Sequence, residues 1–268
     1  MNESEQPVIE VKNLIKCFGD LTVLDGVNVT IPRGQITVIM GGSGCGKTTL
    51  LRHLIALHQP TSGEILVDGK NIVGLRERDM NEVRRKFGML FQGSALFNSM
   101  TVGENVAVPL KEHTDLSPEI IRIIVRVKLE LVGLTGFEDF MPHQISGGMK
   151  KRVALARAIA LDPKIVFYDE PGAGLDPITA SMIDRLILDL SKKLNITSVV
   201  VSHEMKSAFR IADQIIILHK GKVLQIGTAE EIKNSKDSYV QQFIHGESEG
   251  VIPFKQTSEA YLKGLLST

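Results

Sequence analysis

Eight residues in the first quarter of the chain constrain its fold more than any others. They read Gly41-Gly42-Ser43-Gly44-Cys45-Gly46-Lys47-Thr48 and match the pattern G-x-x-x-x-G-K-[ST]. The apolar residues 36–40 before them predict a buried strand, and apolar residues at helical spacing over 50–55 predict a helix after them. A strand, a glycine-rich loop and a helix in this order predict a phosphate-binding loop, because the helix N-terminus adds the positive end of its dipole to the loop.

The residue types in this loop suit the binding of a nucleotide. Glycines let the backbone curl so that successive N–H groups surround phosphate oxygens. Lys47 is expected to reach the β- and γ-phosphates, and the Thr48 hydroxyl to ligate Mg²⁺. Cys45 lies among these anion-binding groups, where the pKa of a thiol tends to fall, so we expect a bound nucleotide to protect it from alkylation. The predicted nucleotide-binding residues are Gly41, Gly42, Ser43, Gly44, Cys45, Gly46, Lys47, Thr48 and Thr49.

Length, charge and cysteine content narrow the class of protein. The 268 residues suffice for one large α/β domain with an insertion, or for two small domains. Lys and Arg together number 31, as do Asp and Glu, and this balance argues against a nucleic-acid-binding protein. Cys17 and Cys45 indicate reduced thiols in a cytosolic protein. The polar first seven residues do not resemble a signal peptide, and no apolar run reaches the roughly 18 residues of a membrane span. We therefore expect a soluble chain that needs a membrane-spanning partner to act at a membrane.

Polar residues follow three further predicted strands at their carboxyl ends. The apolar residues 165–168 precede Asp169 and Glu170. An acid in this position beside a phosphate-binding loop is expected to hold Mg²⁺ through water, and the next acid to deprotonate an attacking water. His203 follows a β-branched strand, and Gln92 follows a short apolar one. Ligands bind at such strand ends in open α/β sheets, although Gln92 alone is better explained as the surface start of a loop.

A helical segment interrupts the alternation of strands and helices. Residues 104–111 and 117–132 predict two helices between strands of the sheet. Ser146, Gly147 and Gly148 then precede a third helix, which Ser146 is expected to cap. The free amides at its start are either a second anion site or the beginning of an ordinary capped helix. The remaining alternation of strands and helices predicts an α/β fold with a mostly parallel sheet.

Two segments leave alternatives open. Phe18 is expected in a short loop over residues 16–20, where it either stacks on an adenine ring or packs at the edge of the core. Residues 247–250 predict a linker, and the apolar residues that follow are too few for a domain. These residues either pack back on the parent fold or dock on another chain. We expect residues 247–268 to form a docking tail that packs on a second copy of the chain or on an accessory protein and supports assembly.

In combination, residues 8–243 resemble the ATP-binding subunit of ABC transporters. The matching motifs, in family order, are the aromatic Phe18, Walker A over 41–48, the Q-loop Gln92, the signature Ser146-Gly147-Gly148, the Walker B Asp169 with the catalytic Glu170, the D-loop Asp176 and the switch His203. Within that family, residues 91–97, residues 104–110 and Met149 are similar to the Mla-type ATPases of bacterial lipid transporters that work with MCE proteins. Ile145, Met149 and Gly174 depart from the wider family pattern.

The resemblance implies a P-loop NTPase fold of the ABC type over residues 1–246. Such a fold has a mostly parallel core, an antiparallel β subdomain and a helical subdomain, here expected at about 93–160. It further implies that ATP and Mg²⁺ bind, with Thr48, Gln92 and, through water, Asp169 as metal ligands. Two copies would face each other head to tail, so that Ser146, Gly147 and Gly148 of one copy close the ATP site of the other. Glu170 would be the general base, and His203 would hold the γ-phosphate and the attacking water.

The function implied by the resemblance is ATP hydrolysis that drives phospholipid transport. The implied partners of the homodimer are an integral membrane permease, an MCE-domain protein and a small STAS-domain protein, at the cytoplasmic face of the bacterial inner membrane. Nucleic acid is not an expected partner. The alternatives are the ATPase of another ABC importer or exporter, a non-transport ABC ATPase that acts on nucleic acid or ribosomes, and an ATP-dependent switch without steady-state turnover. Non-transport members usually carry a coiled-coil insertion or a second ATPase half, and the sequence shows neither.

Overall fold

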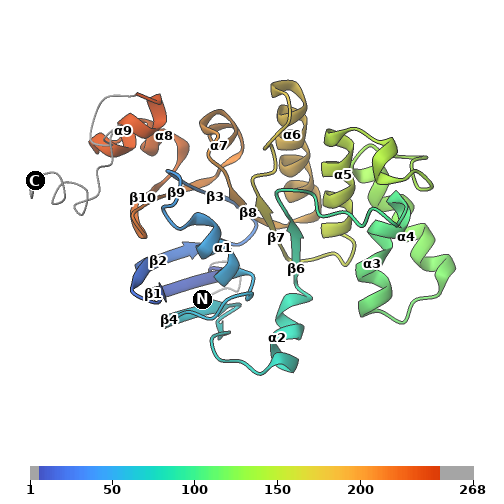
Figure 1. Ribbon diagram of the computed structural model, residues 1–268, viewed down its shortest axis with the longest axis horizontal. Coiled ribbons are helices and arrows are strands. Elements are labelled where there is room, and N and C mark those ends of the chain that lie inside the picture. The colour runs from blue at the N-terminus through green and yellow to red at the C-terminus, as the bar shows by residue number, and fades with distance from the viewer. Residues whose placement is uncertain (1–5, 248–268) are drawn as a thin grey trace, which may run out of the picture.

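A computed structural model of the chain describes residues 6–247, and within them the strands form two sheets (Figure 1). The antiparallel sheet has four strands, in the spatial order β2 (Leu21–Ile31), β1 (Ile9–Phe18), β4 (Ser62–Val67) and β5 (Lys70–Asn71). Apolar and polar residues alternate along β1: Ile9 and Val11 are buried, and Lys12 is exposed. This pattern gives the sheet one face toward the core and one toward solvent.

The second sheet is mostly parallel and contains the strand of the phosphate-binding loop. Its spatial order is β10 (Lys222–Gly227), β9 (Gln214–His219), β3 (Ile36–Gly41), β8 (Thr197–Val201), β7 (Ile165–Asp169) and β6 (Phe87–Leu90), and only β10 pairs in the antiparallel sense. At the carboxyl edge Gly41 pairs with Leu218, and Asp169 with Val201. Because parallel strands end at one edge, the segments after β3, β6, β7 and β8 emerge side by side. The predicted mostly parallel α/β fold is confirmed.

Successive residues of the parallel strands enter two different cores. Val166 and Tyr168 of β7 pack in the core that the helices cover, whereas Ile165 and Phe167 pack in the core shared with the antiparallel sheet. Both faces of the sheet are therefore buried, which explains why its strands are almost continuously apolar. The helices on these faces are α1 (Lys47–Leu54), α2 (Glu77–Arg84), α6 (Pro177–Leu194), α7 (Met205–Ile211), α8 (Ala229–Lys233) and α9 (Ser238–His245).

Helices α3 (Val102–His113), α4 (Pro118–Leu131) and α5 (Gly147–Ala158) lie together at one end of the molecule, with the short helix η2 (Pro142–Gln144) before α5 (Figure 1). The two predicted inserted helices are confirmed, but α3 begins two residues earlier than expected. Thr101 accepts from the Glu104 amide at 3.2 Å, and Glu104 accepts from the Thr101 amide at 2.8 Å. This reciprocal capping box fixes the start of α3.

Two further differences from the sequence-based expectations concern single segments. The expected loop over residues 16–20 is wrong in its first half, because β1 continues to Phe18, where it pairs with Leu21 of β2. Helix α7 was not predicted from the sequence. The predicted docking tail lies outside the described residues apart from residue 247. Among residues 6–247, no helix combines the length and apolar character needed to cross a membrane.

Candidate nucleotide-binding and hydrolysis site

The phosphate-binding loop connects β3 to α1 in a conformation that only glycine adopts without strain. Gly41 has φ +148°, and a Cβ atom there would lie 2.2 Å from the Leu218 carbonyl oxygen of β9. Gly46 has φ 105° and stands at the N-cap of α1, where no side chain caps the helix. The first amides of α1 are therefore left for another acceptor, as an anion site requires.

Lys47 adds a cation to this loop. Its side chain is buried, and its Nζ donates to the carbonyl oxygens of Gly41 at 2.8 Å and Gly42 at 2.9 Å. These carbonyls hold the ammonium within the loop. Uncapped helix amides and a buried cation in one curled segment fit a polyphosphate chain. Ser43, Gly44 and Thr48 belong to the same segment, and Thr49 follows in the first turn of α1.

The surroundings of Cys45 contradict the expected low pKa. The thiol is 6% exposed, and this burial raises the pKa of Cys45, while the charge of Lys47 lowers it by less. Sγ lies 3.9 Å from Lys47 Nζ. The anion-binding loop alone suggested an activated thiolate, but desolvation disfavours the charged form and outweighs the nearby cation.

Three of the predicted site residues meet at the carboxyl edge of the parallel sheet. Gln92 Nε2 donates to Glu170 Oε2 at 3.0 Å, and His203 Nδ1 donates to Glu170 Oε1 at 3.0 Å. Each carboxylate oxygen of Glu170 thus has its own partner. Glu170 has φ 47° and its amide donates to the Val201 carbonyl of β8 at 2.9 Å, so its main chain is fixed in an uncommon conformation.

Asp169 precedes this cluster at the end of β7, half-buried among charges of both signs. Burial raises the pKa of the Asp169 carboxyl and Glu170 raises it further, whereas Arg52, Lys151 and Lys47 lower it. A cation bound nearby favours the charged form of such a carboxylate.

The predicted magnesium ligands are a mixed set of oxygen donors. Thr48 offers a hydroxyl, Gln92 an amide oxygen and Asp169 a carboxylate. Within residues 6–247 no three His, Cys, Asp or Glu side chains group so that they could hold a metal ion by themselves. The donors present nevertheless fit Mg²⁺, which usually binds through one or two carboxylates together with water and substrate phosphates.

The predicted signature residues begin helix α5. The Ser146 hydroxyl accepts from the Met149 amide at 3.3 Å, which confirms Ser146 as the N-cap. A Cβ atom at Gly148 would lie 2.5 Å from Thr179 Cγ2, so glycine allows α5 to pack against the start of α6. There Asp176 accepts from the Thr179 amide at 3.0 Å and caps α6. Figure 1 shows α6 between α1 and α5, so the helix that follows the signature residues lies apart from the helix that follows the phosphate-binding loop.

Phe18 lies on the surface rather than at a core edge. Its side chain is 49% exposed, with the Lys16 ammonium 4.9 Å from the ring centroid and the His58 ring edge-on at 6.3 Å. This exposure argues against the core-edge interpretation, and an exposed ring is what stacking on a base requires.

Sequence reasoning missed one residue of the site, Lys151 of α5. Its side chain is 4% exposed, and its Nζ donates to the main-chain oxygens of Gln92 and Glu170. In the sequence it belongs to the basic run Lys150-Lys151-Arg152, which is typical of a solvated helix face. Burial distinguishes Lys151 from its neighbours, since a buried lysine is uncommon unless it is paired.

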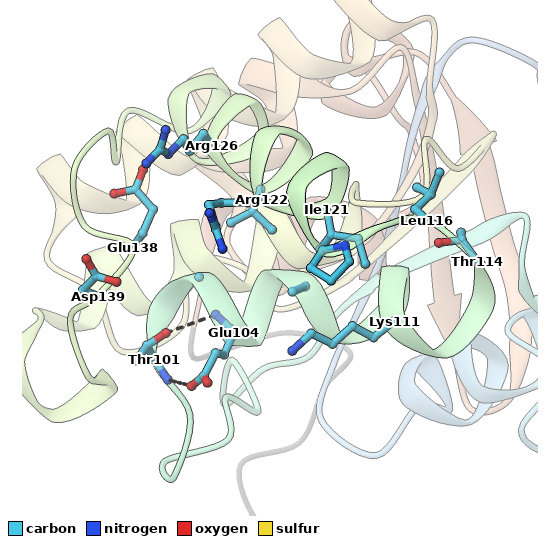
Figure 2. A pocket seen from close by; sticks show the side chains of 14 residues that line it. Thr101, Glu104, Lys111, Thr114, Leu116, Ile121, Arg122, Arg126, Glu138 and Asp139 are labelled. Carbon is cyan, nitrogen blue, oxygen red and sulfur yellow. Dashed lines mark hydrogen bonds between the residues drawn. The ribbon is translucent and has the colours of Figure 1, made fainter.

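A cavity elsewhere in the molecule contains none of the predicted site residues. It has a volume of about 540 Å³ and lies between α3 and α4, with Lys111, Arg122, Arg126 and Glu138 on its walls (Figure 2).

Comparison with known proteins identifies the family. The ABC transporter family matches residues 24–173. The intermembrane phospholipid transport system ATP-binding protein MlaF of Haemophilus influenzae is 48% identical over 260 residues, which cover 97% of this chain and 98% of that protein. MlaF of Escherichia coli K12 is 42% identical over 266 residues, 99% of each chain. A probable ribonucleotide transport ATP-binding protein of Mycobacterium tuberculosis is 40% identical and covers 94% of this chain and 70% of its own length.

Solved structures agree with this assignment. An ATP-binding cassette captured as a dimer in a post-hydrolysis state with ADP and Pi has a TM-score of 0.76 at 34% identity, over 82% of this chain and 98% of that one. The cbiO1 protein of Clostridium perfringens, part of an ABC transporter complex, has a TM-score of 0.80 at 32% identity, over 87% of this chain and 92% of that one. This chain therefore belongs to the ABC transporter family as an ATP-hydrolysing, ATP-binding subunit related to the MlaF proteins.

Proposed function

We propose that this protein hydrolyses ATP as a dimer to drive a phospholipid transporter at the cytoplasmic face of the bacterial inner membrane. The observation that carries the hydrolytic role is the Glu170 carboxylate, held by Gln92 and His203 at the strand edge that also carries the phosphate-binding loop. The phospholipid cargo is inferred from the nearly full-length similarity to MlaF proteins of intermembrane phospholipid transport.

Each predicted residue has a role in this scheme. The loop from Gly41 to Thr49 binds the phosphates, and Phe18 stacks on the adenine. Glu170 takes a proton from the attacking water, and His203 holds that water and the γ-phosphate in place. Positioning and charge stabilisation of this kind account for most of the catalysis of phosphoryl transfer.

Mg²⁺ and the second copy complete the site. Thr48, Gln92 and, through water, Asp169 would hold Mg²⁺, which neutralises charge on the phosphates when it is bound. Ser146, Gly147 and Gly148 of the second copy supply helix N-terminal amides to the γ-phosphate.

The transporter requires further subunits. We propose an integral membrane permease, an MCE-domain protein and a small STAS-domain protein as partners of the dimer. A family assignment to ABC transporters and the chain's lack of a membrane-crossing helix within residues 6–247 support a spanning partner. Residues 1–246 are proposed as the ATPase domain, with a helical subdomain at about 93–160 and a docking tail over 247–268.

Glu170→Gln tests the hydrolytic role. The amide retains the size of the side chain but cannot accept a proton from water, so we expect ATP to bind with unchanged affinity, turnover to be lost and the ATP-bound dimer to accumulate. Phosphate release and size-exclusion chromatography in Mg²⁺-ATP measure these effects. Hydrolysis at the wild-type rate would contradict the role of Glu170.

The cargo is tested by purifying the complex from detergent-solubilised membranes and identifying its subunits and lipid. We expect a permease, an MCE-domain protein and phospholipid. Hydrolysis stimulated by DNA would favour the non-transport alternative, and a complete membrane complex without turnover would favour the switch.

A further inference from the structure

Lys151 is a buried lysine whose ammonium contacts two motifs of the proposed site. It lies on α5, five residues after the N-cap Ser146, and is 4% exposed. Its Nζ donates to the main-chain oxygen of Gln92 and, at 3.5 Å, to that of Glu170. The two acceptors come from the ends of β6 and β7, which are neighbours in the parallel sheet.

The same two residues also meet through their side chains. Gln92 Nε2 donates to Glu170 Oε2 at 3.0 Å, so Lys151, Gln92 and Glu170 form a closed set of contacts. A side-chain contact between two loop residues persists only if both main chains are held in place. Lys151 provides this support from the side of α5.

The Lys151 ammonium lies near the carboxylates of Asp169 and Glu170. Burial lowers the pKa of the Lys151 ammonium, and the two carboxylates offset this effect only in part. A neutral amide or hydroxyl at this position would supply hydrogen bonds but no charge opposite the two acids. A lysine with three donors supplies both.

We propose that Lys151 is a positioning residue that fixes Gln92 and Glu170 for hydrolysis and connects both of them to the signature helix α5. The inference rests on the proposed function, because it concerns the geometry of the proposed general base. When a second copy binds ATP against the N-terminus of α5, a displacement of that helix reaches both residues through one ammonium. Lys151 itself touches neither nucleotide nor water in this scheme.

Lys151→Met in the full-length chain tests the proposal. Methionine retains much of the aliphatic volume but leaves both carbonyls without the ammonium donor. We expect kcat for Mg²⁺-ATP hydrolysis to fall about 10- to 100-fold, as small displacements of catalytic groups do, with the Kd for ATP changed less than about twofold. Equilibrium binding of a fluorescent ATP analogue and steady-state phosphate release separate the two effects.

Lys128→Met is the matched control. Lys128 is also a buried lysine of the helical segment, 5% exposed, but its ion pair is with Asp162, which is not a residue of the site. We expect this variant to lower the thermal midpoint and leave kcat unchanged. Loss of a buried ammonium by itself is thereby separated from loss of the contacts that Lys151 makes.

Two further variants keep the proposal falsifiable. Lys151→Gln retains a donor to a carbonyl, so we expect it to recover part of the kcat lost in Lys151→Met, and it replaces that variant if methionine prevents folding. In a Gln92→Ala background, Lys151→Met should reduce kcat less than in the wild type, because the two changes affect one contact set.

The outcomes distinguish this inference from the function on which it rests. A wild-type chain without ATP turnover would overturn the proposed function and the inference together. An active wild type with unchanged kcat in Lys151→Met, or a fall in kcat as large in Lys128→Met, would overturn the inference alone.

Discussion

At the scale of one residue, burial of Cys45 reverses the lowering of the thiol pKa that its anion-binding motif predicts. Its position in the loop suggested an activated thiolate, yet burial raises the pKa of Cys45 above its ordinary value. A raised pKa means that less thiolate is present at neutral pH, and thiolate is the form that reacts with alkylating reagents.

We therefore expect iodoacetamide to modify Cys45 slowly at pH 7.5, and the rate to keep rising as the pH increases through the ordinary thiol range and beyond. Bound ATP should slow the reaction further by covering the loop. Mass spectrometry of a Cys17→Ser chain over a pH series measures the rate at Cys45 alone. A rate at neutral pH equal to that of a free thiol would contradict the burial argument.

Strand ends and motif order located Gln92, Glu170 and His203 from the sequence, but not their contacts. Glu170 lies 78 residues from Gln92 and 33 from His203, and no local pattern indicates that both donate to one carboxylate. Lys151 could not be predicted at all. Its basic neighbours are typical of a solvated surface, and only the packing of α5 against the sheet shows that its side chain is buried.

At the scale of one element, helix α9 supports the phosphate-binding loop through Tyr239. This side chain is buried, and its ring centroid lies 3.8 Å from that of His219 at the end of β9. Its hydroxyl reaches the loop so closely that a Cβ atom at Gly42 would lie 3.2 Å from it. Gly42 also accepts a hydrogen bond from Lys47, so α9 contacts a peptide that holds the loop cation.

Tyr239→Phe removes this hydroxyl and retains the ring. The loss of one polar contact is worth roughly 0.5–1.5 kcal/mol, so we expect ATP affinity to fall about 2- to 10-fold. The value of kcat should change little, because the Glu170 cluster is untouched. Titration with a fluorescent ATP analogue and steady-state kinetics test this split.

Phe243→Leu is the control on the same helix, since the Phe243 ring stacks on Tyr239 with 6.2 Å between centroids. This variant should leave ATP affinity unchanged. An equal loss of affinity in both variants would mean that general packing of α9, rather than the hydroxyl, supports the loop.

Hydrophobic patterns predicted most elements because both sheets and the longer helices bury regular faces. Helix α6 is one of these longer helices, and Asp176 caps its start while Asn195 adopts a left-handed conformation at its end. The short helix α7 has too few turns to show a period. The bulged register of β1 and β2 interrupts the alternation that marks a strand, so the sequence pattern predicts a loop at Phe18.

At the scale of the whole molecule, the two predicted anion-binding segments lie in different places. Helix α1 begins at the phosphate-binding loop beside the antiparallel sheet, and α5 begins on the far side of α6 (Figure 1). A related cassette was solved as a dimer with ADP and Pi. These observations support composite sites, each with the loop of one copy and the signature residues of the other.

Complementation between inactive chains tests this arrangement. Lys47→Ala removes the loop cation, and Ser146→Arg places a bulky charge at the start of α5. Each homodimer should be inactive, since both of its composite sites carry one defect. In a mixture, the heterodimer contains one site formed by the intact loop of the Ser146→Arg chain and the intact signature of the Lys47→Ala chain. With random pairing, half of the dimers have one of two sites restored, so we expect up to about a quarter of wild-type hydrolysis.

A mixture of Lys47→Ala with the double variant contains no intact site and should remain inactive. Size-exclusion chromatography with two distinguishable tags shows whether the first mixture contains heterodimers. If heterodimers form and the mixture is still inactive, the intact halves have met without restoring hydrolysis. The sites then do not combine residues from two copies.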